Sequence, residues 1–197
     1  SIFRSLFIIA SVLFFLNGCT AAVKPIDMAA RQAGPIIIDH TCTDIRQIPE
    51  QWIQKAKSEF GIAYGHTSHG SQIISGMATL RSESGLYNFG GHSGSGGLTI
   101  YDREPPGDLG NPNRKEWARR TYRLLTEGYG DVNIVVWSWC GQVSNASEAD
   151  IRTYLDLMSQ LERQFPGVAF VYMTGHLDGS GEAGNLNRRN NQIRQFC

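Results

Sequence analysis

The chain of 197 residues carries 18 basic and 18 acidic side chains, so its formal net charge is zero, and 41% of its residues are hydrophobic. This hydrophobic content suffices for one globular domain and excludes an intrinsically disordered chain. The balanced charge gives no general attraction to nucleic acid or to an anionic membrane surface, so we expect no nucleic-acid partner.

The N-terminal segment has the pattern of an export signal. Residues 2–16 carry Arg4 as their only charge, and the apolar stretch from Leu6 to Leu16 is short for a permanent membrane span. The next residues are Asn17, Gly18 and Cys19. Together with Leu16 they resemble the lipobox of bacterial lipoproteins, in which the cysteine is lipidated and becomes the new N-terminus. An ordinary signal peptide, or a membrane anchor with a chance cysteine, is the alternative.

This pattern predicts a lipoprotein signal peptide at 1–18, a tether at 19–34 and a folded domain at 35–197. Export would place the domain in the bacterial envelope, held at the membrane by lipid on Cys19. The mature chain would retain three further cysteines, of which one pair could form a disulfide in an oxidising compartment. These cysteines are Cys42, Cys140 and Cys197.

From residue 35 onward, short apolar runs alternate with amphipathic stretches. The first half predicts an extended segment or strand at 35–39, a helix at 49–59, a strand at 60–65 and a helix at 71–81. The second half predicts a helix at 114–127, a central strand at 132–139 and a helix at 147–165 with Ser147 as N-cap. A buried strand at 168–173 and a helix at 185–197 follow. Alternating strands and helices are typical of a parallel sheet covered by helices on both faces.

Residues 84–112 interrupt this alternation. They are rich in glycine and predict a long irregular segment, with a short strand at 98–101. Long irregular segments inside a compact domain are usually functional or disordered. Tyr87, Phe89 and Tyr101 favour an ordered loop.

Short segments with polar or potentially catalytic side chains follow three of the predicted strands. The strand at 60–65 is followed by His66, Thr67, Ser68, His69 and Gly70, the central strand by Cys140, Gly141 and Gln142, and the last strand by His176 and Asp178. Because ligands of open α/β sheets bind beyond the carboxyl ends of the strands, we expect these side chains to converge.

Ser68 is the candidate nucleophile of this cluster. A serine on a strand-to-helix turn lies where free backbone N–H groups can stabilise an oxyanion, and Gly70 allows a close backbone approach. The structural alternative is that Ser68 only caps the helix at 71–81. The flanking histidines His66 and His69 favour function, and with His92 and Asp178 they are candidate substrate-binding residues.

The order of these segments resembles the SGNH (GDSL-like) hydrolase superfamily over roughly residues 35–197. The resemblance implies a three-layer, flavodoxin-like α/β/α fold and a serine ester hydrolase, with Ser68 in the nucleophile position of YGHTSHGSQ. Gly90 or Gly91 would stand for the oxyanion-hole glycine of the second block. VVWSWCGQ stands where the third block belongs, and Gln142 is the nearest amide to its asparagine.

The base of such an enzyme comes from an Asp-x-x-His motif near the C-terminus, which this chain lacks. A doubly wound sheet normally adds another strand and helix, so the interpretation is a C-terminally truncated chain whose base lies beyond Cys197. His176 is the alternative base, and it is equally well read as a hydrogen-bonding residue of its turn.

Two other classes of function remain open on the sequence. His66, His69, His92, His176 and Asp178 are possible metal ligands, although no zinc signature joins them. The loop at 84–112 could instead bind a sugar or a cell-wall polymer without catalysis. For the hydrolase we expect no cofactor and an ester-bearing small molecule or polysaccharide as substrate.

Overall fold

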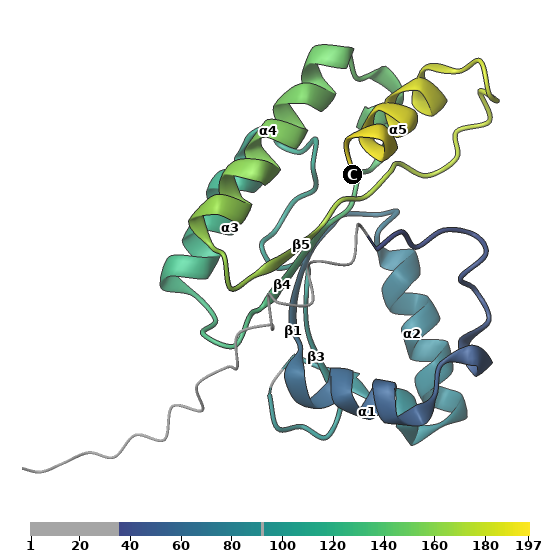
Figure 1. Ribbon diagram of the computed structural model, residues 1–197, viewed down its shortest axis with the longest axis vertical. Helices are drawn as coiled ribbons and strands as arrows, with labels where there is room; N and C mark the ends of the chain where they lie inside the picture. The colour runs from purple at the N-terminus through teal and green to yellow at the C-terminus, as the bar shows by residue number, and fades with distance from the viewer. Residues whose placement is uncertain (1–35, 92) are drawn as a thin grey trace, which may run out of the picture.

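The computed structural model describes residues 36–91 and 93–197 (Figure 1). Within these ranges the strands are β1 (Gly61–Gly65), β2 (Phe89–Gly90), β3 (Leu98–Asp102), β4 (Ile134–Trp137) and β5 (Ala169–Val171). They form one parallel sheet in the order β2-β3-β1-β4-β5. Apart from the short β2, this is the flavodoxin-like strand order, as predicted.

Helices cover both faces of this sheet and complete a three-layer α/β/α fold. They are α1 (Glu50–Glu59), α2 (Ser71–Glu83), α3 (Glu116–Glu127), α4 (Glu148–Gln164) and α5 (Asn185–Phe196). Figure 1 shows α1 and α2 on one face and α3, α4 and α5 on the other. Short 3₁₀ turns lie at η2 (Ile45–Gln47), η3 (Gly85–Tyr87) and η4 (Gly141–Asn145). No helix in the ranges that the structure describes is long and apolar enough to cross a membrane.

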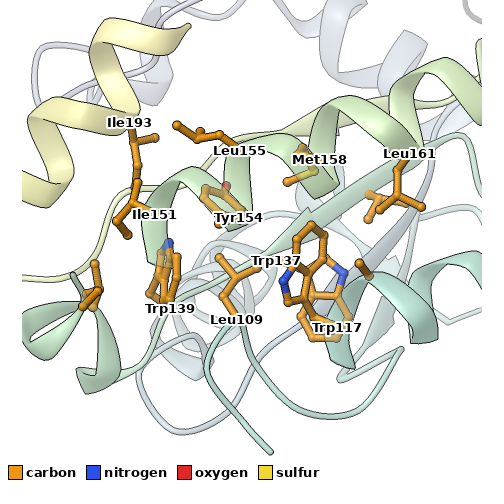
Figure 2. Close-up of a cluster of buried hydrophobic side chains, with 14 of the residues drawn as sticks. Leu109, Trp117, Trp137, Trp139, Ile151, Tyr154, Leu155, Met158, Leu161 and Ile193 are labelled. Atoms are coloured by element: carbon orange, nitrogen blue, oxygen red, sulfur yellow. The ribbon is translucent and has the colours of Figure 1, made fainter. Parts of the chain in front are cut away.

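The hydrophobic core lies almost entirely on the α3–α4–α5 side of the sheet. Figure 2 shows its aromatic centre, where the ring of Trp117 lies 6.2 Å from Trp137 and 5.6 Å from Tyr154, centroid to centroid. All three side chains are fully buried. Neither α1 nor α2 contributes a fully buried residue. The two helical layers therefore differ strongly in how much they stabilise the fold.

The α1–α2 layer instead lines an apolar cavity of about 290 Å³ that is open to solvent. Trp52, Ile53 and Ala56 of α1 line this cavity. The cavity also reaches Leu98, the first residue of β3, so it lies at the amino edge of the sheet, away from the polar turns.

Local sequence explains the ends of the predicted helices. The side chain of Ser147 accepts a hydrogen bond from the backbone N–H of Asp150, whose carboxylate accepts from the N–H of Ser147, so α4 begins with a complete capping box. These hydrogen bonds from Ser147 lower the pKa of Asp150 below its usual value. Gly128 ends α3 as predicted.

The structure decides or refines three further expectations. Of the two alternatives for residues 35–39, a strand is not formed over 36–39, and Ile36, Ile37 and Ile38 are exposed. The strand predicted at 98–101 within the segment 84–112 is confirmed as β3, which is an internal strand between β2 and β1. The strand at 168–173 is shorter than predicted and only partly buried, because β5 pairs with β4 alone.

Of the two predictions about cysteines, the disulfide is tested by the structure and the lipidation of Cys19 is not. Cys42, Cys140 and Cys197 are all free, so the structure contains no disulfide among the residues it describes. Cys19, the tether and His92 lie outside the described residues.

Candidate active site at the carboxyl edge of the sheet

A cysteine and a histidine form a hydrogen-bonded pair at the carboxyl edge of the sheet. The sulfur of Cys140 lies 2.9 Å from Nδ1 of His69. Cys140 follows β4 and His69 follows β1, and these strands are paired in parallel, so their carboxyl ends bring the two turns together. Cys140 is partly buried, whereas His69 is exposed. This geometry places a base beside a nucleophilic side chain, with one side open to solvent.

His176 joins this pair from the third strand end. Its ring stacks on the ring of His69, with centroids 3.8 Å apart and planes 16° from parallel. Its Nδ1 lies 2.9 Å from the carbonyl oxygen of Leu177, which can only accept, so Nδ1 is the donor. In the neutral ring Nε2 then carries the free lone pair, and this buried atom has no hydrogen-bond partner among the residues described. The turns after β1, β4 and β5 therefore converge.

Ser68 lies on the same turn as His69 and is exposed. Its hydroxyl forms no hydrogen bond with any side chain or backbone group in the described ranges. Ser68 is also not the helix cap, because α2 has Gly70 at its N-cap and no side-chain cap. Only its carbonyl oxygen contributes, by accepting from the N–H of Ser71 at 3.3 Å. Capping of α2 therefore does not explain the serine at this position.

Gly70 is required by close packing. A Cβ at this position would lie 2.3 Å from Cβ of His66 and 2.4 Å from Oγ of Ser138. The hydroxyl of Tyr64 donates to the Gly70 carbonyl oxygen at 3.0 Å. These contacts hold the turn that carries Ser68 and His69 against the sheet.

His66 faces the protein rather than a substrate. It is 2% exposed, and its Nε2 lies 2.6 Å from the carboxylate of Asp102 at the end of β3. Its Nδ1 lies 2.8 Å from the carbonyl oxygen of Thr67. Both ring nitrogens are thus occupied by protein atoms, and the substrate-binding role predicted for His66 would need this pairing to break.

Asp108 connects the glycine-rich loop to the turn after β1. This residue is 1% exposed, and its carboxylate accepts from the Thr67 hydroxyl at 2.5 Å and from the Gly110 N–H at 2.7 Å. A longer contact, 3.4 Å, joins it to Nε2 of Gln142. Buried carboxylates are rarely tolerated without such donors, so Asp108 positions the loop, the turn and Gln142 relative to one another.

The remaining predicted residues are dispersed around this cluster. The amide N–H of Gln142 points at Asp108, so the observed geometry uses it in positioning. Gly91 follows the edge strand β2, with β3 between it and β1. The carboxylate of Asp178 turns back onto Ser180, whose hydroxyl and N–H lower the pKa of Asp178 to about 2.

The alternatives from sequence find little support in these contacts. No group of three or more His, Cys, Asp or Glu side chains with the geometry of a metal site occurs in the part of the chain that the structure describes. The loop aromatics are engaged internally, since Tyr101 stacks on Tyr129 and donates to Asp131, and Phe89 lies under Arg81. Tyr101 and Phe89 are therefore not free platforms for a sugar ring.

Comparisons with protein-family models, with curated proteins and with solved structures give no match to this chain. The chemistry must therefore be argued from the site itself.

Sequence reasoning overlooked three residues of this site. Cys140 was expected among the converging residues after the central strand, but it was assigned no catalytic role. Asp102 and Asp108 lie in the segment 84–112, and no local pattern reveals that they approach His66 and Thr67.

Proposed function

We propose that this protein is an ester hydrolase that transfers the acyl group of its substrate to a side chain at the carboxyl edge of the sheet, and then to water. The observation that carries the proposal is the cluster of His69, Cys140 and His176 at three adjacent strand ends, with a nucleophile and a base in hydrogen-bond contact. Covalent acyl transfer needs this pairing, because an unassisted hydroxyl or thiol is a weak nucleophile at neutral pH.

The resemblance to SGNH hydrolases supports the same reaction class with Ser68 as the nucleophile. Ser68 is exposed on the turn after β1, where it can contact a substrate. In this version the candidate base is His176, which stacks on His69 in the same cluster of turns and whose Nε2 has no hydrogen-bond partner among the described residues. Its substrate would be an ester-bearing small molecule or an acyl group on a cell-wall polysaccharide, as location in the envelope suggests.

Trapping the covalent intermediate tests this proposal directly. The full chain is mixed with p-nitrophenyl acetate, quenched in acid and digested, and the peptides are analysed by mass spectrometry. We expect rapid release of p-nitrophenol and one acetyl group on a peptide from the strand-end turns. Protein unfolded in urea is the control, because it retains every side chain but not the site. Equal acetylation of the folded and unfolded chain, or no hydrolysis of short esters, would refute the proposed function.

The envelope location is a separate proposal that rests on Cys19. Lipid attachment through a thioether requires that sulfur, so Cys19→Ala should abolish incorporation of labelled palmitate in bacterial cells. Cys42→Ser is the matched control and should label like the wild type. Undiminished labelling of Cys19→Ala would leave an ordinary signal peptide or anchor.

A further inference from the structure

We propose that the thiol of Cys140, activated by His69, is the nucleophile of this site. This inference deepens the proposed function by naming the acyl acceptor. It starts from the only direct contact between a nucleophilic side chain and a histidine ring among the described strand-end residues, the 2.9 Å separation of Sγ and Nδ1. The hydroxyl of Ser68 has no such contact with a base.

The contact between Sγ of Cys140 and Nδ1 of His69 allows either atom to be the donor, depending on the tautomer of His69. The proposal uses the tautomer in which Nδ1 carries the lone pair, so that the thiol donates to it. The thiol proton can therefore pass to Nδ1 as sulfur becomes the thiolate, which is the reactive form of cysteine. The other ring nitrogen of His69, Nε2, is protonated and faces solvent, because His69 is exposed.

The surroundings hold the base in this orientation. His176 stacks on the ring of His69 at 3.8 Å and is itself anchored to the Leu177 carbonyl oxygen at 2.9 Å. On the other side, Gly70 fixes the turn that carries His69, because Tyr64 donates to its carbonyl oxygen. Both contacts reduce the freedom that the imidazole would lose on reaction.

The reaction balances with water as the only co-reactant. The sulfur attacks the carbonyl carbon of the ester, a C–S bond forms, and the C–O bond to the alcohol breaks. The alcohol leaves with the proton that Nδ1 of His69 took from the thiol. Water then attacks the thioester, one of its protons returns through His69 to the sulfur, and the carboxylic acid leaves as the C–S bond breaks.

Cys140 is accessible enough for this chemistry. It is partly exposed, as a reactive cysteine must be, whereas a structural cysteine is usually fully buried. It also follows β4, an internal strand that is paired on both sides up to Val136 and with β1 at Trp137, so the backbone before Cys140 is firmly held. His176 lies in the same cluster, and its buried Nε2 has no hydrogen-bond partner among the described residues.

Alkylation of the full chain tests the pair without any ester. Iodoacetamide is added below one equivalent at pH 7, and the modified cysteine is identified by mass spectrometry. We expect Cys140 to react at least about tenfold faster than Cys42, although Cys42 is more exposed. His69→Gln should remove this advantage, and His40→Gln should preserve it. Faster reaction of Cys42, or an unchanged rate in His69→Gln, would overturn the inference even if the protein hydrolyses esters.

Ester hydrolysis then distinguishes the two nucleophiles. Cys140→Ala should lose hydrolysis and acyl trapping, and Ser68→Ala should keep both. The reverse result, together with labelling of Ser68 by a fluorophosphonate, would return the role to the serine and leave the proposed function intact. If the wild type hydrolyses no ester while Cys140 alkylates rapidly in a His69-dependent way, the proposed function fails and the activated thiol stands.

Discussion

Replacing His69 with glutamine should lower kcat/KM for ester hydrolysis by about 10²–10⁴-fold, which is the usual contribution of a positioned general base. Glutamine is polar and similar in reach, but its amide cannot accept a proton from the thiol of Cys140 at neutral pH. Because His69 is exposed and its ring contacts only the Cys140 thiol and the His176 ring among the contacts described above, the melting temperature should change little.

His40→Gln is the matched control for this experiment, because His40 is exposed in the segment before α1 and far along the chain from the strand-end turns. Its kcat/KM should equal that of the wild type. His176→Gln provides the second comparison. A rate loss confined to His176→Gln would transfer the role of base to His176, and a loss below about threefold in His69→Gln would exclude His69.

The regular elements of this fold were predictable because their signals are local. The capping box at Ser147 and the spacing of apolar residues in α4 depend only on nearby residues, and the structure places that helix at Glu148–Gln164. The apolar run of β4 likewise predicted a central strand, and β4 pairs on both sides. Parallel pairing of these elements then made the convergence of strand ends predictable as well.

The contacts within the site were not predictable, because they join residues far apart in the sequence. His66 meets Asp102 across 36 positions, and His69 meets Cys140 across 71. Which of several polar side chains on converging turns come into contact depends on strand register and on the path of loops. Neither has a local signature. The same limit applies to β3, because its strand was predicted at 98–101 but its pairing with both β1 and β2 was not.

The uneven core has a functional consequence. The strand ends that carry Cys140 and His176 follow β4 and β5, and the buried cluster in Figure 2 lies on the α3–α4–α5 side of these strands. The turns that carry Cys140 and His176 are therefore attached to the well-packed side of the sheet, and preorganised sites require such rigid surroundings. The α1–α2 layer, with its apolar cavity, contributes less to this support.

Trp137→Ala should therefore reduce the free energy of unfolding by about 3–5 kcal/mol, the usual cost of truncating a buried aromatic side chain. The indole of Trp137 is 0% exposed and donates to the Thr121 hydroxyl at 2.7 Å. Gly65 packs directly on its ring, since a Cβ there would lie 2.3 Å away. Typical domains have only about 5–15 kcal/mol of stability, so this loss is a large fraction.

Urea unfolding followed by circular dichroism measures this loss, with Trp52→Ala as the matched control. Trp52 is the same residue type, but it is 55% exposed on α1 beside the apolar cavity, so its truncation should cost no more than about 1 kcal/mol.

Because Trp137 ends β4 three positions before Cys140, its truncation should also slow alkylation of Cys140 relative to Trp52→Ala under conditions where both variants are folded. Equal destabilisation by the two substitutions would contradict the asymmetry of the core, and with it the argument that the site is supported from one side of the sheet.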